Sequence, residues 1–158
     1  MTSAALLHAV DDARMHCVPR RRQALVVFAH RAHALAARGV LRPQDLQGEE
    51  FVQREEGSRT RQVFEEGMAA FGVTVRTSLE MGSRESVREA VAQGLGLGVV
   101  ARTAFVPDPR LVVLPITGLA MHTHVHLVCR RERREAPLIA AFLAQARELA
   151  DPVADRHA

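Results

Sequence analysis

Short runs of β-branched apolar residues alternate with helix-spaced segments along this chain, and that alternation limits the fold to a few architectures. Residues 24–29 (ALVVFA) form a short, uninterrupted, valine-rich run, which is typical of a strand buried on both faces. The same reasoning predicts strands at residues 73–79, 97–101, 111–116 and 125–129 and one that begins at residues 51–52. Because predicted helices separate several of these strands, we expect an α/β fold with a mostly parallel sheet.

Three segments have the apolar spacing of an amphipathic helix. The first covers residues 60–71 and can end at Gly72, and the second has Ser83 as its N-cap and ends at Gly94. Pro137 can begin the third helix in its first turn. The side chains predicted to face inward are Val63, Phe64, Met68 and Phe71 in the first helix, Val87, Ala90 and Val91 in the second, and Leu138, Ile139, Phe142, Leu143 and Leu149 in the third.

The composition excludes several kinds of chemistry. All 21 basic residues are arginine, so a phosphate-loop lysine, a Schiff-base lysine and a lysine general base are excluded. The only cysteines, Cys17 and Cys129, suit reduced thiols better than a disulfide framework. No apolar stretch approaches the ~20 residues that cross a bilayer, and residues 1–10 lack a basic leader, so we expect a cytoplasmic chain with no membrane contact.

Residues 54–61 (REEGSRTR) are the most informative segment for function, because they lie between a predicted strand and a predicted helix. The start of a helix exposes backbone N–H groups and the positive end of its dipole. With the hydroxyls of Ser58 and Thr60, those amides could bind an oxyanion, and Arg54 could add a forked pair of donors. The alternative is that Ser58 is a plain N-cap and that nearby carboxylates neutralise the arginines. The carboxylates in question are Glu55, Glu56, Glu65 and Glu66.

A second helix start occurs at Ser83, which could cap its own helix or point into the same crevice. Both helix starts follow strands of an α/β sheet, so we expect both to lie along the same edge. Two helix starts that converge in this way would suit a small anionic ligand.

Other motifs are weaker. The glycines of residues 94–98 follow a helix and enter a strand, which is the reverse of the order in a dinucleotide-binding loop. His122, His124 and His126 share one strand face, but no fourth ligand is evident, so we predict no metal and no cofactor. Residues 130–134 (RRERR) are more typical of a solvated turn than of a nucleic-acid site. Since no coherent set of nucleophile, base and oxyanion donors occurs, we do not expect an enzyme.

Taken together, residues 25–73, 80–102, 110–115 and 137–150 resemble the effector-binding domain of LysR-type transcriptional regulators in collinear order. The resemblance implies a two-lobed fold like that of type 2 periplasmic binding proteins, with a small inducer between the lobes. It implies a complete second lobe at residues 49–115 and a partial first lobe. The first lobe would comprise a remnant at residues 1–23 and the segments 24–48 and 116–150, followed by a tail at 151–158.

The resemblance also implies roles for the loop residues, because REEGSRTR is similar to the oxyanion loop of phosphate-type binding proteins in that superfamily. By this analogy Arg54, Ser58 and Thr60 would bind the anion, Glu56 could accept a proton from it, and Arg59 could crowd or extend the pocket. The predicted effector-binding residues are Arg54, Glu56, Gly57, Ser58, Arg59, Thr60 and Ser83. A wider pattern is similar to regulators associated with 2-aminoethylphosphonate breakdown, which favours a phosphonate or phosphate-like effector.

LysR-type regulators normally begin with a winged helix-turn-helix, and no such segment precedes residue 24 here. We therefore expect an N-terminally truncated sensing domain that does not bind an operator by itself. The edge left by the missing strands would favour homo-oligomers or pairing with other family members. The alternative is a non-sensing interaction fragment that pairs with full-length regulators.

Overall fold

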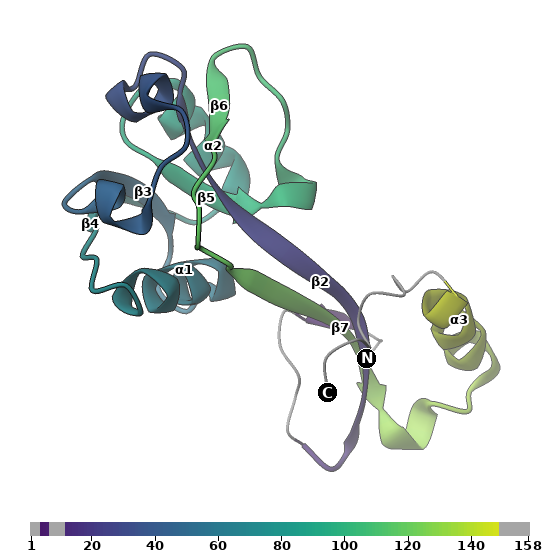
Figure 1. The fold of residues 1–158 in the computed structure, drawn as a ribbon. Helices are drawn as coiled ribbons and strands as arrows, with labels where there is room; N and C mark the ends of the chain where they lie inside the picture. The colour runs from purple at the N-terminus through teal and green to yellow at the C-terminus, as the bar shows by residue number, and fades with distance from the viewer. Residues whose placement is uncertain (1–3, 7–11, 149–158) are drawn as a thin grey trace. The chain divides into compact units, whose positions relative to one another are not determined.

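Two compact units make up the computed structural model, which describes residues 4–6 and 12–148 (Figure 1). The larger unit comprises Ala24–His122, and the smaller unit comprises Met1–Gln23 together with Thr123–Ala158. The predicted tail at residues 151–158 lies outside the described residues. Within the described ranges, no helix is long and apolar enough to cross a membrane.

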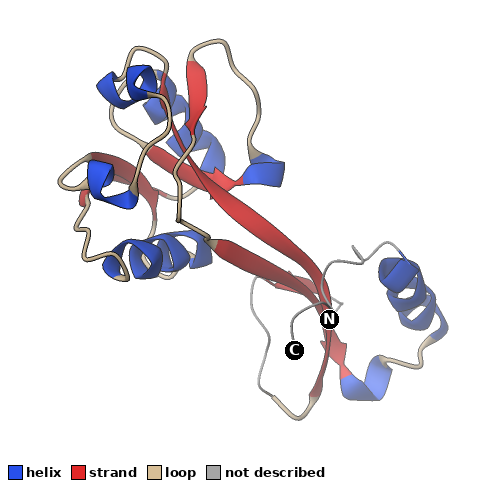
Figure 2. Cartoon of the chain, viewed as in Figure 1, coloured by secondary structure: helices blue, strands red, loops and turns tan. Residues whose placement is uncertain are grey.

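Strand β2 (Met15–His30) belongs to both units, and its second half is the central strand of the larger unit, where two strands pair with it (Figure 2). Strand β5 (Gly98–Ala101) and strand β6 (Leu111–Leu114) both run antiparallel to β2. A separate parallel pair is formed by β3 (Glu50–Arg54) and β4 (Arg76–Met81). The prediction of a mostly parallel sheet is therefore wrong. A valine-rich run indicates a strand that is buried on both faces, but it does not indicate whether that strand is parallel or antiparallel to its neighbours.

The prediction that residues 24–29 are buried on both faces is confirmed for Leu25 to Ala29, all of which are buried. Alternate residues of β2 enter two different hydrophobic clusters. Leu25, Val27 and Ala29 pack in the cluster that contains α1 (Arg59–Ala69). Val26 and Phe28 pack in the cluster that contains α2 (Arg84–Ala92). Because successive side chains of a strand point to opposite faces, the two helices cover opposite faces of β2.

Two short 3-10 helices, η1 (Ala34–Arg38) and η2 (Pro43–Leu46), place Leu35 and Leu46 in the same cluster as α1. Leu41, between the two helices, is buried in that cluster as well. Residues 24–48 therefore pack with residues 49–115, as do residues 116–122. The predicted assignment of 24–48 and 116–150 to a first lobe and of 49–115 to a second lobe stays a prediction. The predicted helical turn at η2 is present, with Pro43 at its start.

Helix α1 ends earlier than its apolar pattern predicts. Its last residue is Ala69, and Gly72 makes the turn beyond it with a φ of 68°. Phe71 lies after the helix and is 41% exposed, so its assignment to the core is wrong. Val63, Phe64 and Met68 face inward as predicted.

The smaller unit contains the first half of β2, the strands β1 (Ala4–Leu6) and β7 (His122–Arg130), and the helix α3 (Pro137–Glu148). Strand β7 lies between β1 and β2, and it is antiparallel to β1. Helix α3 begins at Pro137 as predicted. The sequence pattern predicted neither β1 nor the first half of β2.

Helix α3 packs on β7 through Leu143 and Ala146, which contact Leu127 and Cys129. The inward placement of Leu138 and Phe142 is wrong, because these side chains are 84% and 51% exposed. Leu149, also predicted inward, lies outside the described residues. Cys17 and Cys129 are free cysteines in the described part of the chain, in keeping with the expectation of reduced thiols.

Candidate functional site

The turn between β3 and α1, residues 55–58, is tight and depends on one glycine. Gly57 has a φ of 88°, a backbone conformation that residues with a side chain rarely adopt. The amide of Ser58 donates to the carbonyl oxygen of Glu55 at 3.1 Å, which closes the turn. The chain therefore passes from the last residue of β3, Arg54, into α1 within four residues.

Ser58 occupies the N-cap position of α1, but its side chain makes no cap hydrogen bond. No acidic side chain lies in the first turn of the helix either. Thr60 belongs to this turn, and both side chains are half-buried. The first N–H groups of a helix have no partner within the helix, so this one begins without a side-chain acceptor for them. The alternative in which Ser58 acts as a side-chain cap is not what the structure shows.

Ser83 behaves differently at the start of α2. Its hydroxyl oxygen accepts from the backbone N–H of Ser86 at 3.0 Å, and the two hydroxyls are 2.9 Å apart. Ser83 is therefore an ordinary N-cap with its side chain already engaged. The shared edge of the two helix starts is confirmed. Arg54 pairs with Met81 in the parallel β3–β4 register, so both turns follow the carboxyl ends of adjacent strands.

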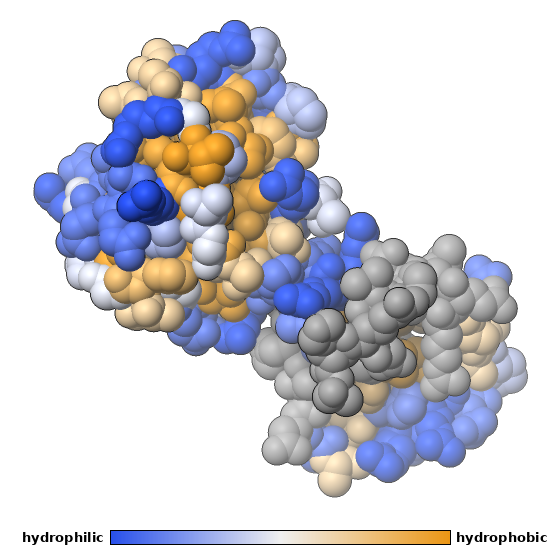
Figure 3. All heavy atoms as spheres, in the orientation of Figure 1, coloured by the Kyte–Doolittle hydropathy of each residue, from blue (hydrophilic) through white to orange (hydrophobic). Residues whose placement is uncertain are grey.

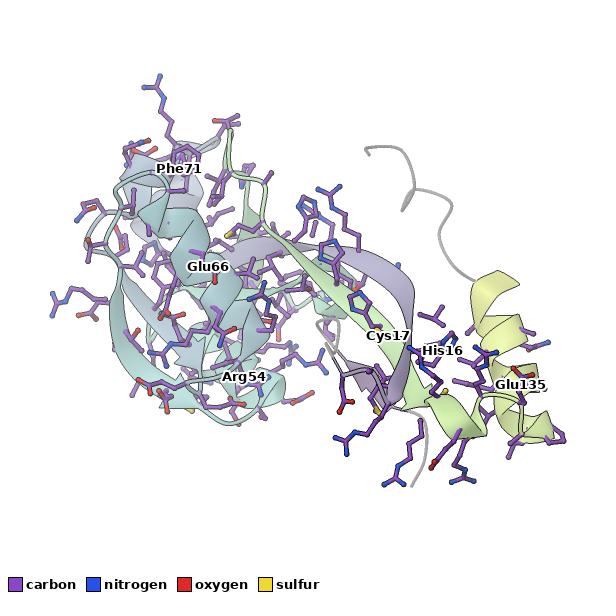
Figure 4. All side chains as sticks on the ribbon, turned by 90° about the horizontal axis from the view of Figure 1, so that it is seen from below. His16, Cys17, Arg54, Glu66, Phe71 and Glu135 are labelled. Atoms are coloured by element: carbon purple, nitrogen blue, oxygen red, sulfur yellow. The ribbon has the colours of Figure 1, made fainter. Side chains whose placement is uncertain are left out.

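The arginines of this segment are paired with carboxylates. Arg54 donates from Nε and Nη2 to the two carboxylate oxygens of Glu55, each at 2.7 Å. This forked contact lowers the pKa of Glu55, chiefly through the hydrogen bonds from the guanidinium. Arg59 lies 3.8 Å from Glu66. Figure 4 shows Arg54 and Glu66 on the larger unit. The neutralisation of the arginines by nearby glutamates, which the sequence left open, is thus present.

Two residues that the sequence analysis did not single out hold this segment in place. Arg61 donates to the backbone oxygen of Arg54 at 3.1 Å and forms ion pairs with Glu65 and Glu80 at 2.8 and 2.7 Å. The buried amide of Gln53 donates to Thr77 of β4 at 2.9 Å and lies 3.4 Å from Glu65. A glutamine that directly follows the apolar pair Phe51–Val52 was the available signal for Gln53.

The structure separates some of the predicted site residues from others. Arg54 lines a cavity of about 200 Å³ together with Arg84 of α2, whereas Ser58 and Thr60 do not line it. Glu56 is exposed and lies in the turn beside Gly57. Thus Ser58, Arg59 and Thr60 belong to the start of α1, whereas Arg54 is the last residue of β3 and lines the cavity.

The histidines of β7 and the arginine-rich segment 130–134 are the remaining motifs that the sequence analysis considered. His122, His124 and His126 alternate along β7, with the rings of His124 and His126 6.4 Å apart. Among the residues that the structure describes, no group of three histidine, cysteine, aspartate or glutamate side chains could hold a metal ion. Residues 131–133 form a short 3-10 turn, η4 (Arg131–Arg133), with exposed side chains.

Comparison with known proteins identifies the relatives of this chain. The family model for the LysR substrate binding domain matches residues 4–151. A RuBisCO operon transcriptional regulator of Allochromatium vinosum is 39% identical over 121 residues, which cover 75% of this chain and 40% of that protein.

Solved structures agree with this match at the level of the fold. The regulatory domain of Synechocystis PCC6803 CcmR in complex with 2-PG has a TM-score of 0.82 at 23% identity, covering 96% of this chain and 74% of the other. The effector-binding domain of QuiR with shikimate has a TM-score of 0.83 at 16% identity, covering 94% and 71%. The mixed α/β fold is therefore that of LysR effector-binding domains, which resemble periplasmic binding proteins.

The chain spans about 40% of the length of the curated regulator that it matches. Its own match to the family model, in contrast, extends over residues 4–151 of 158. On that match, the chain belongs to the LysR substrate-binding domain family.

Proposed function

We propose that this chain is the effector-sensing domain of a LysR-type transcriptional regulator and that it binds a small anionic metabolite at the start of α1. The observation that carries this proposal is the unused N-terminus of that helix. Ser58 makes no cap hydrogen bond, and the first turn holds no carboxylate. An oxyanion there would accept from the free N–H groups and would be stabilised by the positive end of the helix dipole.

The proposed ligand has a phosphate-like or phosphonate-like head group. The hydroxyls of Ser58 and Thr60 would donate to its oxygens, and Arg54 could exchange its contact with Glu55 for a contact with the ligand. Glu56 would accept a proton from a protonated oxyanion, and Arg59 would border the pocket. Regulatory domains of the same fold have been solved with 2-PG and with shikimate, which supports a small-molecule effector in general. The 2-aminoethylphosphonate subgroup remains a prediction.

Calorimetric titration of the purified chain with inorganic phosphate, sulfate and 2-aminoethylphosphonate tests this proposal. We expect saturable binding of at least one of these anions, weakened about tenfold by the double substitution Ser58→Ala, Thr60→Ala, because each lost hydrogen bond to a charged group weakens binding. The matched control is Thr74→Ala, Thr103→Ala, which removes two exposed hydroxyls of the larger unit. Absence of heat at millimolar anion with folded protein would refute anion sensing by this chain.

A second function is favoured by a different observation. Strand β4 pairs only with β3 in the described part of the chain, and five of its six residues are exposed. Such an edge presents unpaired backbone groups to another chain. We propose, as the alternative, an interaction fragment that forms homo-oligomers or pairs with full-length family members. Neither proposal requires the chain to catalyse a reaction or to bind an operator by itself.

The second function is tested by co-purification with a full-length LysR-type regulator and by light scattering of the chain alone. A stable complex with the regulator, or a dimer of the chain, would support it. A monomer that captures no regulator would exclude it and would leave anion sensing as the remaining function.

A further inference from the structure

The cavity that Arg54 borders lies entirely within the larger unit, on the face of β2 that α2 covers. Its inner wall is apolar and buried, with Phe28, Val87, Val99 and Val100 all at most 9% exposed. Phe105 closes one side, and its ring meets that of Phe28 edge-on with the centroids 5.6 Å apart. The volume of the cavity is about 200 Å³.

The rim of this cavity is charged. Arg84 and Arg88 are four residues apart on α2 and both line the cavity, so their guanidinium groups lie on the same side of the helix. Two like charges at this spacing repel each other. Glu85 also lines the cavity and is exposed.

The two arginines differ in their partners. Arg88 donates to Asp108 at 2.7 Å, which fixes its side chain, while its Nε is buried with no acceptor among the described residues. Arg84 forms no ion pair with any described residue and is exposed. The cavity therefore combines an apolar interior with a rim of three arginines and the carboxylate of Glu85. Arg54 and Arg88 are paired with Glu55 and Asp108, whereas Arg84 has no such ion pair among the described residues.

We propose that this cavity is a second ligand site, separate from the start of α1, for a small monocarboxylate with an apolar body. The apolar body occupies the wall formed by Phe28, Val99 and Phe105, and the carboxylate lies at the rim between Arg84 and Arg88. Pockets of this kind are mostly apolar with a few polar groups that fix the orientation of the ligand. Figure 3 shows hydrophobic residues beside hydrophilic ones on the surface of the larger unit.

The second site adjoins the proposed anion site, because Arg54 borders the cavity, but its remaining residues are different. Neither Ser58 nor Thr60 lines the cavity, and its apolar wall has no counterpart at the start of α1. An inorganic anion has no apolar part to fill this wall, whereas a monocarboxylate buries its body there. The two sites should therefore prefer different ligands and respond to different substitutions.

Fluorine NMR titration of the full chain with 4-fluorobenzoate tests this inference. This probe has about ten non-hydrogen atoms, a size for which binding at a well-formed small pocket is expected in the millimolar range or tighter. We expect a saturable shift of the fluorine signal with the wild-type chain. We expect little binding of 4-fluorobenzyl alcohol, which has the same ring without the charge.

One variant tests the apolar wall of the cavity, and another tests its charged rim. Ala104→Phe places a ring in the cavity and should abolish the saturable shift, provided that circular dichroism shows a folded chain. Arg84→Gln changes an exposed side chain and should weaken 4-fluorobenzoate binding about fivefold. Arg31→Gln is the matched control, since Arg31 is an exposed arginine of the same unit that does not line the cavity.

Several outcomes would overturn the proposal. They are a wild-type chain without saturable binding, a folded Ala104→Phe variant that binds as the wild type does, or equal weakening by Arg84→Gln and Arg31→Gln. The Ser58→Ala, Thr60→Ala variant should bind 4-fluorobenzoate normally. If that variant alone lost the probe, the probe would occupy the anion site and the second site would be refuted, while the proposed function would stand.

Discussion

Gly98 of β5 lies opposite Phe28 of β2 in the antiparallel register, and the Phe28 ring occupies the space that a side chain at residue 98 would need. A Cβ atom on Gly98 would lie 2.5 Å from Cζ of Phe28 and 2.9 Å from Cγ2 of Val91. Phe28 is also part of the wall of the α2-side cavity. The glycine thus permits both the close packing of this ring and the shape of the cavity.

Gly98→Ala should therefore lower the free energy of unfolding by about 1–3 kcal/mol, because overpacking forces the Phe28 ring or the backbone to move. Urea denaturation followed by circular dichroism measures this change. The control is Gly82→Ala, whose new methyl group would have no neighbour within 4 Å and should change stability by less than about 0.5 kcal/mol. Equal stability of the two variants would contradict the packing described for Phe28.

Substitutions of Leu143 and Leu138 test which face of α3 is buried. Leu143 is 4% exposed and Leu138 is 84% exposed. Leu143→Ala should reduce the free energy of unfolding by about 2–4 kcal/mol, the range for deletion of a buried leucine side chain. Leu138→Ala should leave it within about 0.5 kcal/mol. If the two substitutions had the opposite order of effect, the inward face would be the one that apolar spacing alone suggested.

Short sequence patterns predicted the positions of the helices. The proline at the start of α3 and the capping serine of α2 indicate where those helices begin, and the apolar spacing of α1 indicates that the segment is helical. The long apolar pattern of α3 did not identify its buried face, because Leu138 and Phe142 are as apolar as the residues that face β7. Burial depends on the partner surface, which the helix sequence does not contain.

Strand pairings between distant parts of the chain were not predicted, because they too depend on a partner that the local sequence does not contain. Residues 15–23 (MHCVPRRRQ) are rich in arginine and include a proline, so they lack a strand pattern, yet they belong to β2. Pairing with β7 provides the hydrogen bonds that the local sequence does not suggest. At the site, a serine at the start of α1 could be foreseen. The sequence left open whether Glu55 neutralises Arg54, because adjacent residues of a regular strand point to opposite faces, and it is the turn after β3 that brings the two side chains together.

Asp108 should make stability depend on pH in the acid range. Hydrogen bonds from Arg110, with a further contribution from the charge of Arg88, lower the pKa of this carboxyl from 3.8 to about 2. A carboxyl whose pKa is lower in the folded state stabilises the fold above its unfolded pKa. That stabilisation is lost as the pH falls from about 4 to about 2.

The urea midpoint measured between pH 5 and pH 2, within the range over which this carboxyl titrates, reports the effect. We expect the midpoint of the wild-type chain to fall on acidification and that of Asp108→Asn to fall less. Asp12→Asn is a matched comparison in the smaller unit, because Arg14 lowers the pKa of Asp12 to about 2 in the same way. If Asp108→Asn had the same pH slope as the wild-type chain, the ion pairs of Asp108 would not contribute to folding.

Glu55 competes with the proposed anion for Arg54, and this competition can be measured. Glu55→Gln removes the carboxylate that both donors of Arg54 contact at 2.7 Å. The freed guanidinium should raise the affinity for phosphate up to about fivefold, since an exposed ion pair contributes about 1 kcal/mol at most. Calorimetry with phosphate at low salt gives the comparison. Glu132→Gln, which removes an exposed carboxylate in the smaller unit, controls for the change in net charge. If both variants gained affinity equally, the gain would be due to overall charge, and Arg54 would have no direct part in anion binding.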